Sequence, residues 1–153
     1  MASVRLARAL ALLTPLALLG GAYIAQYVFN LPPCEMCWWQ RYPHFVALAF
    51  AIAAYVWRPG RLAIVIAALA IAVSGLIGGF HAGVEYGWWE GLTACTANIA
   101  DGEDPLAAIL NAPIIRCDVA PWSLLGISLA GWNFLLSGAS ALAIVLLLRK
   151  ARR

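Results

Sequence analysis

Long apolar segments separated by short polar ones run through the whole chain, and this pattern predicts membrane helices. A spanning helix needs about 20 mostly apolar residues, because its backbone polar groups must all be satisfied without water. Four segments approach that length, and we expect spans at about residues 9–29, 42–57, 62–84 and 121–148. The predicted fold class is an all-α integral membrane protein, a four-helix transmembrane bundle formed by one domain over residues 1–153.

The predicted connections differ in length and content. Residues 58–61 leave room only for a tight turn between the second and third spans. On the other face, a shorter loop covers about residues 30–41 and a longer one about residues 85–120. Within the longer loop, Asp104 suits a helix N-cap and Pro105 suits the first helical position. We therefore expect a short interfacial helix there, lying on the membrane surface.

Composition agrees with a membrane protein and excludes other classes. Hydrophobic residues make up 64% of the chain and charged residues 11%, with a mean hydropathy of +0.85. Soluble domains contain about 25% charged residues. The net charge is only +3, and basic residues cluster only at the C-terminus. We therefore expect the lipid bilayer, and no nucleic acid, among the partners of the chain.

The distribution of charge predicts the orientation of the spans. Lys and Arg residues near span ends are retained in the cytoplasm. Eight of the ten lie before the first span, in the turn at 58–61 or after the last span, whereas all seven acidic residues lie in the two longer connections. Both termini are therefore expected in the cytoplasm. A cleaved signal peptide is a disfavoured alternative, because the first apolar run is about twice as long as a signal h-region.

All four cysteines fall in the two outer loops and form two different pairs. Cys34 and Cys37 form a CxxC unit just before a predicted helix, where unpaired N–H groups and the helix dipole favour a thiolate, with Cys37 the better placed. Cys95 and Cys117 have 21 residues between them, a loop that a disulfide can close. Purely structural disulfides are an alternative, but a CxxC bridge closes almost no loop. A zinc site is another, although the repeated CxxC spacing of zinc ribbons is missing.

Four motifs give the chain a resemblance to a known family. They are CEMCWWQR at residues 34–41, GFHAGVE at 79–85, RCD at 116–118 and PWSLLGISLAGWN at 121–133. Together they resemble the disulfide-bond formation protein B (DsbB) family of bacterial inner membranes. The resemblance implies an enzyme that reoxidises a periplasmic, thioredoxin-like DsbA-type thiol oxidase. It also implies that the electrons pass to the membrane quinone pool, either ubiquinone or menaquinone.

The resemblance further implies a role for each cysteine. The thiolate of the partner would attack Cys95, with Cys117 as its mate. Electrons would then pass by thiol exchange to Cys34, leaving Cys37 as the thiolate that faces the quinone. The longer loop would have to bring Cys117 to Cys34.

Two further residues are expected at the cofactor. Arg41 lies four residues after Cys37 on the same helix face, where its charge suits both the thiolate and a quinone carbonyl. His81 is an ionisable residue near the outer end of the third span, and we expect it to donate a proton or a hydrogen bond to the quinone. Gln40 and His44 are interpreted as ordinary polar residues near a membrane interface.

Two other functions stay open at the level of the sequence. A vitamin K epoxide reductase-like enzyme also uses a CxxC beside a quinone in a four-helix bundle. It usually carries its loop cysteines before the CxxC, whereas here the CxxC comes first. A non-catalytic membrane protein with structural disulfides would show no thiol titration on reduction and no response to quinone.

Overall fold

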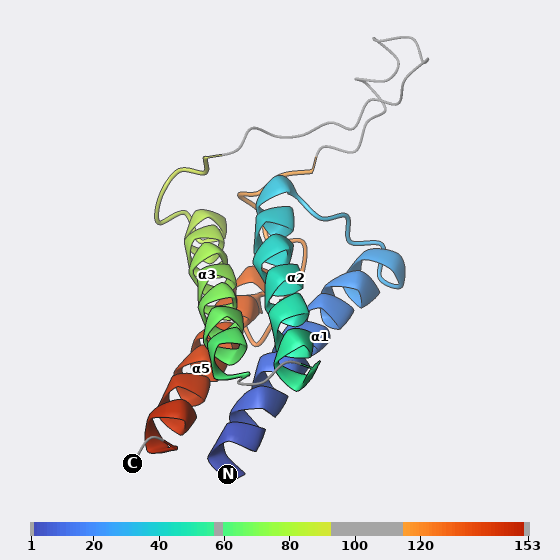
Figure 1. Ribbon diagram of the computed structural model, residues 1–153. Coiled ribbons are helices and arrows are strands. Elements are labelled where there is room, and N and C mark those ends of the chain that lie inside the picture. Colours follow the sequence, from blue (N-terminus) through green and yellow to red (C-terminus); the bar gives the residue numbers. More distant parts are fainter. Residues whose placement is uncertain (1, 57–59, 93–114, 152–153) are drawn as a thin grey trace.

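The chain folds into a bundle of helices that run along a common direction (Figure 1). The computed structural model describes residues 2–56, 60–92 and 115–151. Within these ranges the helices are α1 (Ala2–Tyr27), α2 (Glu35–Val56), α3 (Arg61–Glu85) and α5 (Leu129–Lys150). Both termini lie at the same end of the bundle (Figure 1). The expected helical architecture is therefore confirmed.

Three of the helices, α1, α3 and α5, are long and apolar enough to cross a membrane. Helix α2 is not among them, and its first half carries Gln40, Arg41 and His44. A crossing by α2 therefore stays a prediction. The expected interfacial helix of the longer loop lies outside the described residues, as does Cys95.

The segment before α5 corrects one boundary expected from the sequence. The apolar pattern predicts a span from about Pro121, but a hairpin precedes the helix. Strand β1 (Ser123–Leu124) pairs antiparallel with β2 (Ile127–Ser128). The turn residues Leu125 and Gly126 both have positive φ, 55° and 76°, as the favoured two-residue hairpin turn requires. An apolar segment of this length suits a strand as well as a helix, so composition alone does not locate the start of α5.

Tyr86, the residue after α3, holds the hairpin against the bundle. Its hydroxyl donates to the Gly126 carbonyl at 3.2 Å and accepts from the Ser128 backbone N–H at 3.2 Å. The Ser128 side chain in turn caps α5 by accepting from the Gly131 N–H at 3.1 Å. The hairpin is thereby positioned beside the end of α3.

Small residues fill the core in the half of the bundle nearest the termini. Most of its buried members are alanines, which allow helix backbones to approach closely. They are Ala7, Ala11, Ala47, Ala51, Ala54, Ile64, Ala67, Ala68, Ile71, Ala141, Ile144 and Leu148. At the terminal end the Arg61 guanidinium donates to the Leu148 carbonyl at 2.9 Å, which joins α3 to α5.

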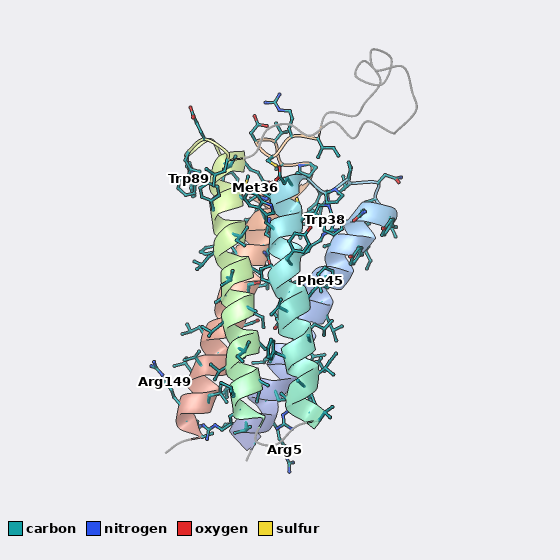
Figure 2. All side chains as sticks on the ribbon, turned by 45° about the horizontal axis from the view of Figure 1, so that its top comes forward. Arg5, Met36, Trp38, Phe45, Trp89 and Arg149 are labelled. Carbon is teal, nitrogen blue, oxygen red and sulfur yellow. The ribbon has the colours of Figure 1, made fainter. Side chains whose placement is uncertain are left out.

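The opposite half of the bundle is chemically different. Figure 2 shows Arg5 and Arg149 at the terminal end, and Trp38 and Trp89 at the other. A second buried cluster lies at that other end and contains Cys34, Met36, Val84 and Cys117. The described cysteines therefore lie at the end of the bundle away from both termini.

Candidate functional site

Cys34 and Cys37 form the first part of the site, at the start of α2. Cys34 immediately precedes the helix, and Cys37 lies in its first turn. The Cys34 thiol donates to Cys37 Sγ at 2.9 Å, and the Cys37 backbone N–H donates to Cys34 Sγ at 3.3 Å. The hydrogen bond to Cys37, followed by burial, raises the pKa of Cys34 to about 12. In the reduced pair the proton therefore stays on Cys34, and Cys37 is the sulfur able to carry negative charge.

Cys117 and His81 come to this pair from distant parts of the chain. The Sγ atoms of Cys34 and Cys117 and a ring nitrogen of His81 all lie within 4.8 Å of one another. His81 Nε2 is 3.6 Å from Cys34 Sγ and 3.7 Å from Glu85 Oε1. Cys34, His81 and Glu85 border a cavity of about 260 Å³. A cysteine from each loop is thus close to the other, as thiol exchange between the loops requires.

Two buried amides, Gln40 and Asn133, connect His81 to the interior of the bundle. Gln40 Nε2 donates to the Met36 carbonyl at 3.2 Å and also meets His81 Nδ1 at 2.9 Å. Asn133 Nδ2 donates to Gln40 Oε1 at 2.9 Å and to the Ser74 carbonyl at 3.1 Å. A backbone carbonyl can only accept, so reversing either amide would leave buried polar groups without partners.

The orientation of these amides determines which ring nitrogen of His81 carries hydrogen. His81 Nδ1 receives the Gln40 N–H and is therefore a lone-pair acceptor. The hydrogen of the neutral ring is then on Nε2, which faces Cys34 and Glu85. A metal ion held by Cys34, His81 and Cys117 would need the lone pair of that same nitrogen. The network therefore favours thiol chemistry over metal binding at this cluster of Cys34, His81 and Cys117.

Arg41 is buried and is held by the neighbouring helix α1. Its guanidinium donates to Gln26 Oε1 at 2.6 Å and to the Ala22 carbonyl at 3.2 Å. It also lies over the rings of Tyr23 and Trp38, 4.9 and 4.8 Å from their centroids, where cation–π attraction stabilises it. All these groups are neutral. Within the described part of the chain, the Arg41 charge therefore has no carboxylate partner.

A largely apolar cavity of about 360 Å³ lies between α1, α2 and α5. Its most polar lining residues are Cys37, Gln40, Arg41, His44 and Asn133. An apolar cavity with a few convergent polar groups is typical of small-molecule sites. Cys37 also borders the smaller cavity beside Cys34, so this cysteine lines both cavities. His81 borders the smaller cavity and not the larger one.

Comparison with known proteins gives this arrangement a family context. Residues 4–147 match the family model described as Disulfide bond formation protein DsbB. The chain belongs to the DsbB family. A relative named Disulfide bond formation protein B, from Polaromonas sp. (strain JS666 / ATCC BAA-500), is 31% identical over 159 residues, with 95% of this chain and 91% of the relative covered.

A second relative of this DsbB-family chain is the Uncharacterized protein RP370 of Rickettsia prowazekii (strain Madrid E). It is 26% identical over 125 residues, with 78% of this chain and 73% of the relative covered. No solved structure matches the chain. Family membership and the apolar helices together identify a membrane oxidoreductase of disulfide-bond formation.

The structure groups the predicted site residues of this DsbB-family protein in two places. Cys34, Cys117 and His81 meet at the smaller cavity, Arg41 lies on the larger one, and Cys37 borders both. The fourth cysteine lies outside the described residues. His81 lies beside Cys34, away from the lining of the larger cavity, and its expected role at a cofactor stays a prediction.

Sequence reasoning missed Asn133 and gave too little weight to Gln40 and His44. Polar side chains inside apolar spans are costly unless they are hydrogen-bonded, which makes them a signal of function. At the level of the sequence, that signal is present at His44 and Asn133, whereas Gln40 lies just before the expected span at 42–57. An interfacial location explains Gln40 and His44 equally well at the level of the sequence, and only helix packing joins them to Asn133 in one network.

Proposed function

We propose that the chain reoxidises a periplasmic DsbA-type dithiol oxidase and transfers the electrons to ubiquinone or menaquinone in the membrane. The observation that carries this proposal is the position of Cys37 on both cavities. Cys34 borders the smaller cavity with Cys117 close by, and the larger cavity is apolar. The smaller cavity suits electrons that arrive from a water-soluble donor, and the larger apolar cavity suits a lipid-soluble electron acceptor.

The proposal places all four helices across the bacterial inner membrane, with both termini in the cytoplasm and both cysteine loops in the periplasm. The polar groups of α2 have partners inside the bundle, since Gln40 bonds to Asn133 and Arg41 bonds to α1. Satisfied polar groups of this kind are compatible with a crossing by α2. The basic residues at the terminal end, such as Arg5 and Arg149 in Figure 2, support the orientation.

Thiol exchange in this arrangement conserves electrons at each step. The partner thiolate attacks Cys95 of a Cys95–Cys117 disulfide, and the second thiol of the partner then releases both cysteines in reduced form. The Cys117 thiolate next attacks Cys34 of a Cys34–Cys37 disulfide and frees Cys37 as a thiolate. Cys95 finally attacks Cys117, which restores the outer disulfide and leaves the inner pair reduced. The proximity of the Cys34 and Cys117 sulfurs, within 4.8 Å, supports the middle step.

The larger cavity fits a quinone ring in size and in chemistry. Its volume of about 360 Å³ falls within the roughly 300–1,000 Å³ of small-molecule sites. A bound quinone supplies an acceptor for two electrons and two protons. Arg41, whose contacts are with neutral groups, stabilises negative charge on Cys37 and offers a donor for an acceptor oxygen. Trp122 and Trp132 add to the apolar lining.

A steady-state assay tests the proposal. The purified chain in detergent micelles should oxidise a reduced DsbA-type protein only when a short-chain ubiquinone or menaquinone is supplied. The variant Cys34→Ser/Cys37→Ser keeps the outer pair and should oxidise no more than one equivalent of the partner. Turnover of the wild type without quinone, or full turnover of the double variant, would refute the proposal.

A further inference from the structure

His44 is a buried side chain that takes no part in the thiol-exchange steps between the cysteines. It lies on α2 three residues beyond Arg41, is 3% exposed, and borders the apolar cavity with Cys37 and Arg41. Its Nε2 meets Asn133 Oδ1 at 3.0 Å, whereas its Nδ1 is buried without a hydrogen-bond partner. A buried nitrogen without a partner is costly. Where such a nitrogen belongs to a cavity-lining residue, a ligand atom can supply the missing bond.

The network around Asn133 determines which nitrogen of His44 carries hydrogen. Asn133 Nδ2 donates to Gln40 Oε1 and to the Ser74 carbonyl, so Asn133 Oδ1 is the atom that faces His44. The same oxygen accepts from the Ser137 hydroxyl at 2.9 Å. An amide oxygen can only accept, so His44 Nε2 must carry hydrogen. In the neutral ring, Nδ1 is therefore a bare acceptor.

We propose that His44 is a catalytic contact of the quinone in this cavity, exchanging one proton with a quinone oxygen through Nδ1, and that Asn133 positions it. The inference rests on the proposed function, since its ligand is a quinone and the corresponding quinol. Nε2 keeps its hydrogen in both charge states of the ring, so exchange occurs only at Nδ1. The protonated ring donates to a carbonyl oxygen, and the neutral ring accepts from a hydroxyl.

The proton balance of the reaction shows what one histidine in this cavity can do. Counted from the protonated dithiol, oxidation of Cys34 and Cys37 to a disulfide releases two electrons and two protons, the first proton when Cys37 ionises to its thiolate, and conversion of a quinone to a quinol takes up two of each. His44 delivers one of these protons and is reprotonated from those that the dithiol releases. Arg41 cannot take this role because its guanidinium stays protonated. Among the described residues that border the cavity, His44 and Cys37 are the side chains able to release a proton.

Substitution of His44 separates this inference from the proposed function. His44→Phe keeps a planar ring without nitrogen atoms, and His44→Gln keeps a hydrogen-bonding group that cannot take up a proton. With a ubiquinone bearing one prenyl unit, we expect kcat to fall by about 10²-fold or more in both variants, the lower range for a lost general acid. The quinone KM should rise more for Phe than for Gln. Thiol exchange with the partner in one turnover without quinone should stay unchanged, which also shows that both variants are folded.

Nitrogen NMR of the ¹⁵N-histidine-labelled protein tests the assigned tautomer. His44 Nδ1 should give the signal of an unprotonated ring nitrogen that shifts when the one-prenyl ubiquinol is added, and Asn133→Leu should allow hydrogen on Nδ1. Wild-type quinone kinetics in both His44 variants, or hydrogen on Nδ1 in the resting protein, would overturn the inference and leave the proposed function intact. Absence of quinone-dependent turnover in the wild type would instead overturn the proposed function.

Discussion

Replacement of Gly78 by alanine should perturb the helix contact on which the buried network depends. A Cβ at this position would lie 2.9 Å from the Ala130 carbonyl oxygen, 2.9 Å from Asn133 Nδ2 and 3.1 Å from Gln40 Oε1. The Ala130 oxygen belongs to the backbone of α5, so α5 must move away from α3. Such overpacking costs about 1–3 kcal/mol, and exchanging a helical glycine for alanine returns about 0.5–1 kcal/mol. We expect a net loss of about 1 kcal/mol in the free energy of unfolding.

The same movement should lengthen the bond between Gln40 and Asn133 and release His44 from its assigned tautomer. Quinone-dependent turnover should therefore fall even where the variant is fully folded. Gly138→Ala on α5 is the matched control, because a Cβ there meets nothing within 4 Å. Unfolding followed by circular dichroism in micelles and steady-state turnover measure the two effects. If Gly78→Ala and Gly138→Ala have the same unfolding stability and the same turnover, the close approach of α3 to α5 at Gly78 is refuted.

Three further substitutions test other parts of the account. Cys117→Ala leaves Cys95 as a lone thiol, which should attack the disulfide of the oxidised partner and hold that partner as a mixed disulfide in a non-reducing gel, because Cys117 is no longer present to attack Cys95 and displace it. Equal trapping by Cys95→Ala would contradict the assigned order. Arg41→Gln should lower kcat/KM for quinone by about one to two decades, since a charge-assisted hydrogen bond contributes roughly 1.5–3 kcal/mol. Arg41→Lys should lose less because the charge remains, and unchanged kinetics in both variants would leave Arg41 a purely structural role. Tyr86→Phe removes two hydrogen bonds to the hairpin and should reduce unfolding stability by about 1–3 kcal/mol; a wild-type unfolding midpoint would show that the hairpin is held by other contacts.

The helix boundaries were predictable from the sequence where the apolar segment and the helix begin and end at nearly the same residues. Helix α3 (Arg61–Glu85) differs by one residue at each end from the expected span at 62–84. Helix α1 begins earlier than its apolar segment because Arg5 and Arg8 are good helix formers and extend it on the polar side. The hairpin before α5 was not predictable from hydropathy. Its turn depends on the backbone conformation of Leu125 and Gly126, to which hydrophobicity is insensitive.

The candidate site was predictable where residue type and spacing alone indicate the chemistry, as at Cys34, Cys37 and Arg41. The polar network was not, because Ser74 and Asn133 belong to different helices and meet only through the rotation of α3 and α5 about their axes. Hydropathy does not determine that rotation.

An anaerobic count of disulfide equivalents tests most directly the claim that electrons from the partner pass through two cysteine pairs and leave the protein to a quinone. Fully oxidised, quinone-free protein mixed with excess reduced DsbA-type partner should oxidise two equivalents, one for each cysteine pair, and then stop. Addition of a short-chain ubiquinone or menaquinone should restart oxidation and yield one quinol for each further disulfide. Oxidation that continues without quinone, or that fails to restart with either quinone, would contradict the claim.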